Sequence, residues 1–182
     1  MTKTLALKTS LIVSALLALP LANAAISKTD YSAGKTRISA DYKANKAACD
    51  SLKANAKDIC VEEAKAKEKV ARAELEFNYT GKPADQTKLL ETKAKTAYAV
   101  AKEKCDDKAG NDKDVCVKEA KAAEVKGLAD AKMGKQITEA KKDATADKRD
   151  ADYKVAAEKC DAMSGDAKNA CIASAKARFG KT

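Results

Sequence analysis

Six cysteines at a regular spacing constrain the fold of this 182-residue chain more than any other feature. They form three pairs whose members are 11 positions apart, namely Cys49/Cys60, Cys105/Cys116 and Cys160/Cys171. The pairs begin 56 and then 55 residues apart, and every first cysteine is preceded at seven positions by a tyrosine (Tyr42, Tyr98 and Tyr153). Such self-similarity indicates a threefold structural repeat.

The cysteine spacing predicts a bend between the two members of every pair. In one straight helix, residues 11 positions apart would be separated by about 16 Å, whereas a disulfide needs Cα atoms within roughly 4.4–6.8 Å. Midway between the cysteines lie Ala54-Asn55, Gly110-Asn111 and Gly165-Asp166. We expect Gly to end one helix in the left-handed conformation and Asn or Asp to cap the next. The predicted disulfides are therefore Cys49–Cys60, Cys105–Cys116 and Cys160–Cys171, each closing an antiparallel αα-hairpin.

Small residues on the predicted arms favour close helix packing. Tyr98, Ala101 and Cys105 share one helical stripe, and small side chains favour the short end of the usual interaxial range of about 8–10 Å. We interpret Tyr42, Tyr98 and Tyr153 as hairpin packing residues. Their rings can cover aliphatic stems on the opposite arm, such as those of Lys67 or Arg178.

The composition of residues 25–182 favours helices with a small core. Of these 158 residues, 35 are Ala and 30 are Lys, and only 19 are Leu, Ile, Val or Phe. That composition excludes a large β-sandwich or TIM barrel, whereas Ala, Lys and Glu are strong helix formers. We predict an all-α fold of three disulfide-stapled antiparallel αα-hairpins, joined into an elongated helical array or thin bundle. Helices are expected near 27–53, 56–78, 84–108, 112–133, 138–162 and 167–179.

Two segments link the predicted hairpins. Gly81 and Pro83 form a stop-and-restart signal. The equivalent break falls near 133–138, where Gly134 stands; the alternative is one long helix over 112–163. Asn78-Tyr79-Thr80 matches a glycosylation sequon, which we interpret as turn chemistry.

Residues 1–24 have the features of a secretory signal peptide. Lys3 and Lys8 form a basic region, an uncharged apolar run follows over 11–21, and Ala22-Asn23-Ala24 fits a cleavage site. The run is too short to favour a membrane span of about 20 residues; the alternative is an uncleaved anchor helix. We expect a periplasmic or secreted mature chain, 25–182, without a transmembrane segment. Its 34 basic and 27 acidic residues give a net charge of +7.

The cysteines could in principle bind a metal or exchange electrons. Structural zinc sites and redox enzymes normally use closely spaced CxxC pairs, which are missing here, and the chain contains no His. Neither a Gly-rich phosphate loop nor a nucleophile elbow is present. We therefore predict structural disulfides, no metal, no cofactor and no enzymatic activity.

The segment from Cys105 to Ala122 contains Cys-Asp followed by Lys-Asp-Val-Cys-Val-Lys-Glu-Ala-Lys-Ala. This pattern resembles exported proteobacterial proteins with cysteine-hairpin repeats that are often labelled TolA-like, and the resemblance covers nearly all of residues 25–182. It implies a periplasmic location and a helical fold, and it implies no catalytic residues. The likeness to TolA itself is compositional, so a role in energising the envelope is not implied.

These observations predict a non-enzymatic periplasmic helical protein with a structural or binding role at the cell envelope. Its partner would be an unknown envelope protein. One alternative is an anionic envelope-surface binder, for lipid or lipopolysaccharide, which would use the net positive charge. Another is a thiol-disulfide buffer or redox sensor. Nucleic acid is not an expected partner of an exported chain, and the oligomeric state is left open.

Overall fold

The computed structural model describes residues 26–181, which form helices and connecting turns without a strand in that range. The helices are α1 (Lys28–Ala48), α2 (Ala54–Thr80), α3 (Pro83–Cys105), α4 (Gly110–Cys160) and α5 (Gly165–Phe179), and a 3-10 turn, η1 (Cys49–Ser51), follows α1. The predicted all-α fold is therefore confirmed. The predicted signal peptide, 1–24, lies outside the described residues.

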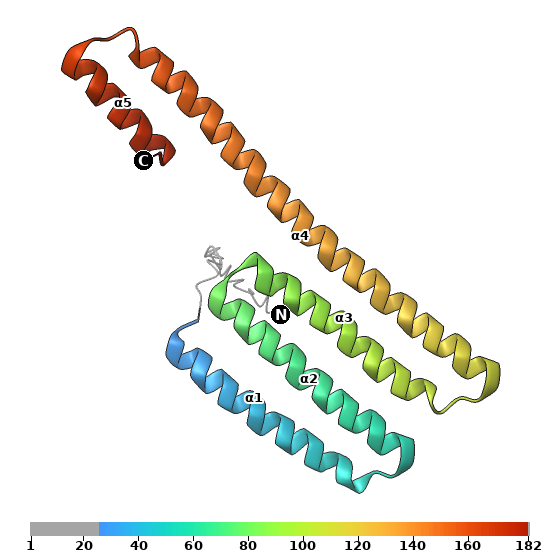
Figure 1. Ribbon diagram of the computed structural model, residues 1–182. Helices are drawn as coiled ribbons and strands as arrows, with labels where there is room; N and C mark the ends of the chain where they lie inside the picture. The colour runs from blue at the N-terminus through green and yellow to red at the C-terminus, as the bar shows by residue number, and fades with distance from the viewer. Residues whose placement is uncertain (1–25, 182) are drawn as a thin grey trace, which may run out of the picture.

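The helices form a layer one helix thick. Helices α1, α2, α3 and the first half of α4 lie side by side in chain order, each antiparallel to the next (Figure 1). Within the described range every helix contacts only its neighbours in sequence. Helix α4 continues past the other three, and α5 folds back along its far end (Figure 1). The elongated array of hairpins expected from the sequence is confirmed, and the 51 residues of α4 give it a length of about 76 Å.

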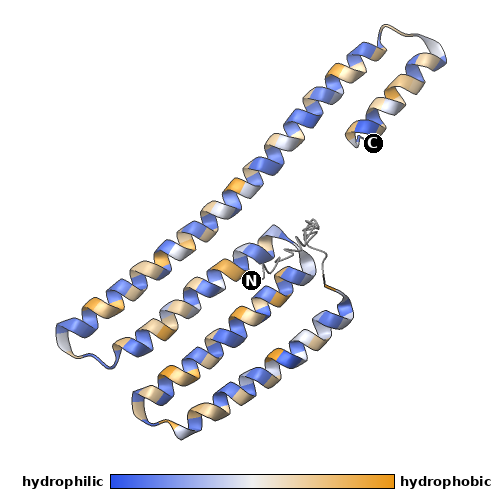
Figure 2. Cartoon of the chain, turned by 180° about the vertical axis from the view of Figure 1, so that it is seen from behind, coloured by the Kyte–Doolittle hydropathy of each residue, from blue (hydrophilic) through white to orange (hydrophobic). Residues whose placement is uncertain are grey.

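The layer has little conventional core. Apolar residues are scattered along all helices between charged ones (Figure 2). The largest fully buried side chains are Cys49, Cys105 and Cys160. The other buried apolar residues are single positions along the helix contacts: Ile38, Ala64, Leu89, Ala131 and Ala175. Much of the helical stability must therefore come from the intrinsic propensity of Ala, Lys and Glu.

Helix α4 corrects one expectation from the sequence. The break near 133–138 does not occur, and the alternative of one long helix is confirmed, because α4 continues without interruption from Gly110 to Cys160. A Cβ atom at Gly134 would meet nothing within 4 Å, whereas one at Gly127 would lie 2.9 Å from the Cβ of Ala94. Gly134 is thus an exposed helical glycine, whose cost of about 1 kcal/mol weakens a helix without ending it. Gly127 instead allows α3 and α4 to approach closely.

These two glycines give a matched test of the α3–α4 contact. Changing either residue to Ala improves helix propensity by about 1 kcal/mol, but only Gly127→Ala forces a methyl group against Ala94. We expect Gly134→Ala to increase the free energy of unfolding. Gly127→Ala should give no such gain or should destabilise the protein, because overpacking costs about 1–3 kcal/mol. Urea unfolding of both variants checks this; equal stabilisation would contradict the close contact.

The link between the first two hairpins follows the prediction. Helix α2 ends at Thr80, and Gly81 adopts the left-handed conformation with φ 62°, its N–H donating to the Phe77 carbonyl at 2.8 Å. Pro83 then begins α3, where its missing N–H costs nothing. The Asn78-Tyr79-Thr80 segment is the last turn of α2, and the ring of Tyr79 stacks on Tyr31 of α1 at 4.3 Å between centroids.

Candidate functional site at the stapled tips and the α2–α3 grooves

Disulfides close all three hairpins. The structure pairs Cys49–Cys60, Cys105–Cys116 and Cys160–Cys171, with Cα–Cα distances of 5.6, 5.7 and 5.7 Å, so the predicted connectivity is confirmed. The first cysteine of every pair is fully buried, whereas the second is partly exposed. Each disulfide therefore serves as the local core of its hairpin tip.

The turn chemistry at the tips differs from the prediction. The C-cap residues that follow the first arms are in the right-handed conformation: Cys49, Asp106 and Asp161. The left-handed residues instead begin the second arms: Ala54, Gly110 and Gly165, with φ of 48°, 53° and 59°. The N-cap positions are Lys53, Ala109 and Ser164, and none makes a side-chain capping hydrogen bond. At every tip the chain reverses through an extended N-cap residue that is followed by a left-handed residue. Gly110 and Gly165 therefore begin the second arms, whereas they were expected to end the first ones.

Asn55 was predicted to cap a helix, but its side chain makes contacts with the neighbouring hairpin instead. Its side-chain amide donates to the Glu103 carbonyl at 3.0 Å and to the Asp107 carboxylate at 2.7 Å. Both acceptors belong to the second hairpin, so Asn55 connects two neighbouring tips. A local pattern in the sequence does not reveal such a contact, because it depends on how α2 and α3 lie side by side.

Ala54 occupies a position where the other two repeats have glycine. A left-handed conformation costs a residue with a Cβ about 1–2 kcal/mol. We expect Ala54→Gly to increase the free energy of unfolding by up to about 1 kcal/mol and Gly110→Ala to reduce it by a similar amount. Thermal unfolding of the two variants provides the measurement. A stability loss in Ala54→Gly would show that the tip does not require this backbone conformation.

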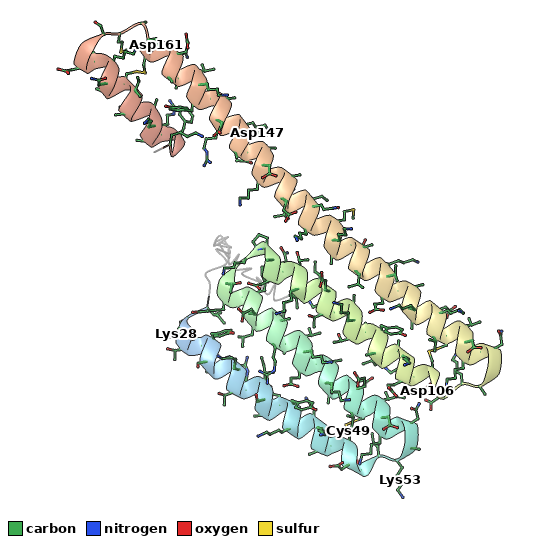
Figure 3. All side chains as sticks on the ribbon, viewed as in Figure 1. Lys28, Cys49, Lys53, Asp106, Asp147 and Asp161 are labelled. Atoms are coloured by element: carbon green, nitrogen blue, oxygen red, sulfur yellow. A yellow bond between two sulfur atoms is a disulfide. The ribbon has the colours of Figure 1, made fainter. Side chains whose placement is uncertain are left out.

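A recurring ion pair accompanies each disulfide. The aspartate after every first cysteine accepts from a lysine three positions before the second: Lys57–Asp50 at 2.9 Å, Lys113–Asp106 at 2.8 Å and Lys168–Asp161 at 2.8 Å. Asp106 and Asp161 mark two of these tips in Figure 3. The hydrogen bond to Asp106 raises the pKa of the Lys113 ammonium. The sequence signal was the lysine common to all repeats, but exposed pairs of this kind contribute at most about 1 kcal/mol.

The three repeated tyrosines lie half-buried against the opposite arms of their hairpins. The Lys121 ammonium of α4 lies 5.0 Å from the ring centroid of Tyr98, and Tyr153 meets Phe179 of α5 edge-on at 6.5 Å. Tyr42 and Lys67 line a small cavity of about 150 Å³ between α1 and α2. The Arg178 stem, which was expected to lie under a tyrosine, instead places its guanidinium over the ring of the adjacent residue Phe179 at 5.3 Å, within α5. The contacts of Tyr98, Tyr153 and Tyr42 join opposite arms. These positions fit packing between arms.

An open groove with an apolar floor lies between α2 and α3 on one face of the layer. We call it the Val70–Val100 groove, and its volume is about 620 Å³. Alanines complete the floor: Ala66, Ala71, Ala97 and Ala101. Charged side chains form the rim: Lys67, Glu74, Lys93 and Lys104. Such a surface can contact an apolar chain below and an anionic group at its edge.

The opposite face of the α2–α3 pair has a more polar groove of about 500 Å³. Its charged lining consists of Lys69, Arg72, Glu76, Asp85, Lys88 and Lys95. Thr96 lines both grooves and is buried between them, with its hydroxyl donating to the Thr92 carbonyl at 2.8 Å. Both grooves exist because the layer is one helix thick, so no other described helix covers either face.

Ion pairs engage some of the cations along these grooves. Lys104 donates to Glu63 at 2.7 Å and lowers the pKa of that carboxyl group. On the other face Arg72 bonds Glu68 at 2.7 Å. Within residues 26–181, Lys67 and Lys93 have no acidic group within 4.0 Å. These two lysines are the charges most available to an anion at the Val70–Val100 groove.

Comparisons with known proteins give no relative: no family model, no curated protein and no solved structure matches the chain. Between residues 26 and 181, none of the helices combines the length and apolarity needed to cross a membrane. The same range holds no cluster of three or more His, Cys, Asp or Glu side chains suited to a metal ion. Three disulfides are typical of an oxidising, extracytoplasmic compartment.

Proposed function

We propose that this chain is an exported, non-enzymatic helical protein of the periplasm with a structural or binding role at the cell envelope. The observation that carries the proposal is the set of three disulfides, each closing one tip of an extended helical layer. Disulfides persist where thiols are kept oxidised. The resemblance of the Cys105–Ala122 region to exported TolA-like proteins supports the same compartment.

The shape of the molecule supports a binding or spacing role. A layer one helix thick exposes grooves on both broad faces, and α4 carries the third hairpin away from the first two (Figure 1). Such a surface suits a partner that lies along the helices. Thiol-disulfide exchange has less support, because one cysteine of each pair is fully buried.

Photo-crosslinking in cells tests this proposal. A photoreactive residue replaces Val100 in the groove, and a second variant carries it at the exposed tip residue Leu52 as a control. We expect one discrete envelope component to be captured from position 100 and not from position 52. Turnover of a cell-wall, peptide or thiol substrate by the purified protein, abolished by a single substitution, would contradict a non-enzymatic role.

Binding of an anionic amphiphile, such as a lipid or lipopolysaccharide, is a second candidate function. The Val70–Val100 groove favours it by combining an apolar floor with the cations of Lys67 and Lys93. We expect Lys67→Gln/Lys93→Gln to weaken binding to vesicles rich in anionic lipid at low salt. The matched control Lys135→Gln/Lys142→Gln removes the same charge from an exposed part of α4. Equal weakening by both variants would indicate general charge attraction without a groove site.

A further inference from the structure

The outer side of α4 is an unpartnered helix face. The buried residues of α4, Glu124, Ala131 and Cys160, lie on one side of the helix, toward α3 and α5. Figure 1 shows both of these helices on the same side of α4, so its opposite side forms one edge of the layer. No described helix covers that edge.

This edge carries an apolar stripe. At about 100° per residue, the sector within about 40° of one line opposite the buried side contains three charged residues, Glu119, Lys126 and Glu158. The same sector contains eight apolar residues. We call them the outer stripe, and all are exposed: Val115, Ala122, Met133, Ile137, Ala140, Ala144, Ala151 and Val155. Met133 is 53%, Ile137 47% and Val155 56% exposed. Met133, Ala144 and Val155 follow an 11-residue period, which keeps a stripe nearly straight along a helix.

Charged residues flank the outer stripe on both sides, and at four matching levels along α4 the charge on one flank has the opposite sign to the charge on the other. One flank carries Asp130, Lys141, Lys148 and Asp152. The other flank carries Lys132, Asp143, Asp147 and Lys154, each within two positions of its counterpart and of opposite sign. Asp147 lies on the stretch of α4 between α3 and α5 (Figure 3). In the described chain none of these eight residues has an ion-pair partner within 4.0 Å.

We propose that the outer stripe binds a second copy of this chain, with the two α4 helices parallel and in register about a two-fold axis. That axis brings each flank against the opposite flank of the other copy. Lys141 then faces Asp143 of the second copy, and Asp130 faces Lys132 of the second copy. Because the two-fold repeats every pair, eight opposite-charge contacts border the apolar stripe.

The same charges disfavour an antiparallel pair centred on Ala144. An antiparallel two-fold brings each flank against itself. Centred on Ala144, it would bring Lys141 near Lys148 of the second copy and Asp143 near Asp147 of the second copy. Like charges at these positions are destabilising. The charge pattern therefore favours the in-register parallel arrangement over this antiparallel one. In the parallel pair, helices α1 to α4 of the two copies form one continuous layer, with α1 at both outer edges and the α2–α3 grooves uncovered.

Sedimentation of adjacent-residue variants tests the proposed face. We expect the wild-type chain to dimerise reversibly and Ile137→Glu to raise the dissociation constant by at least about tenfold. Thr138→Glu adds the same charge to the neighbouring residue, which lies toward the inner side of α4, and should leave the dissociation constant unchanged. A wild-type chain that stays monomeric at millimolar concentration, or equal effects of the two variants, would overturn the proposal.

Crosslinking and a charge exchange test the orientation. Met133→Cys should form a disulfide between position 133 of both copies under mild oxidation, because in-register parallel helices bring these positions together. An antiparallel pair centred on Ala144 would separate them by about 33 Å. Lys141→Glu should weaken the dimer, and Lys141→Glu/Asp143→Lys should restore it. No crosslink at position 133, or no restoration in the double variant, would overturn the parallel arrangement.

Discussion

Replacing Cys160 and Cys171 by serine is expected to release α5 from α4 while the layer of α1 to α4 stays folded. Helix α5 has 15 residues and contacts only α4 within the described chain. Isolated helices shorter than about 12–15 residues are marginal in water, and this disulfide contributes roughly 2–3 kcal/mol by restricting the unfolded chain. Amide hydrogen exchange should show loss of protection across 165–179.

The double variant Cys49→Ser/Cys60→Ser is the matched control for that experiment. Its helix α1 has 21 residues and packs along α2 through buried Ile38, the Gly34–Leu75 contact and the Tyr31–Tyr79 stack. We expect α1 to stay docked and only its tip to lose protection. If α5 kept its protection in the first variant, or if α1 were released equally, the disulfides would not have the unequal importance that the packing implies.

The second large effect is expected from a proline in the middle of α4. Thr145→Pro should break or kink α4, since proline inside a helix costs about 3 kcal/mol or more. Residues 134–145 are exposed, and no other helix of the described chain lies beside them (Figure 1). The two ends of the molecule should therefore stay folded but lose their fixed separation.

Distance measurements between labels at Lys118 and Lys159, on dilute protein, check this expectation. In the wild type the distribution should be narrow and centred near 60 Å, the length of about 41 helical residues. Thr145→Pro should shorten and broaden it, whereas Thr145→Ala should leave it unchanged. A broad wild-type distribution would contradict a continuous α4 and would restore the break expected near 133–138.

The hairpins could be predicted from the sequence because covalent geometry decided them. A spacing of 11 positions excludes a disulfide in a straight helix, and three repeats agreed on it. The continuity of α4 could not be predicted in the same way. Gly134 is a local signal for a break, but Lys, Ala and Glu around it favour helix. Within residues 26–181 this stretch is exposed, so packing against another helix does not decide the outcome.

The roles of residues that contact a neighbouring helix could not be predicted from the sequence pattern either. Asn55 fits a cap locally, yet its amide bonds to Glu103 and Asp107 across the layer. The Val70–Val100 groove depends on the rotation of α2 against α3, which periodicity alone does not give. The lysines at the tips could have been identified from the sequence, because Lys57, Lys113 and Lys168 occupy the same position in each repeat.

Non-reducing peptide mapping of the chain recovered from the periplasm of an expressing bacterium tests the central claim most directly. The experiment reports both the compartment from which the chain is recovered and the pairing of its cysteines. We predict an N-terminal peptide beginning at Ala25 and only the linkages Cys49–Cys60, Cys105–Cys116 and Cys160–Cys171. Linkages between different repeats, or six free thiols in the recovered chain, would contradict an exported protein built from three stapled hairpins.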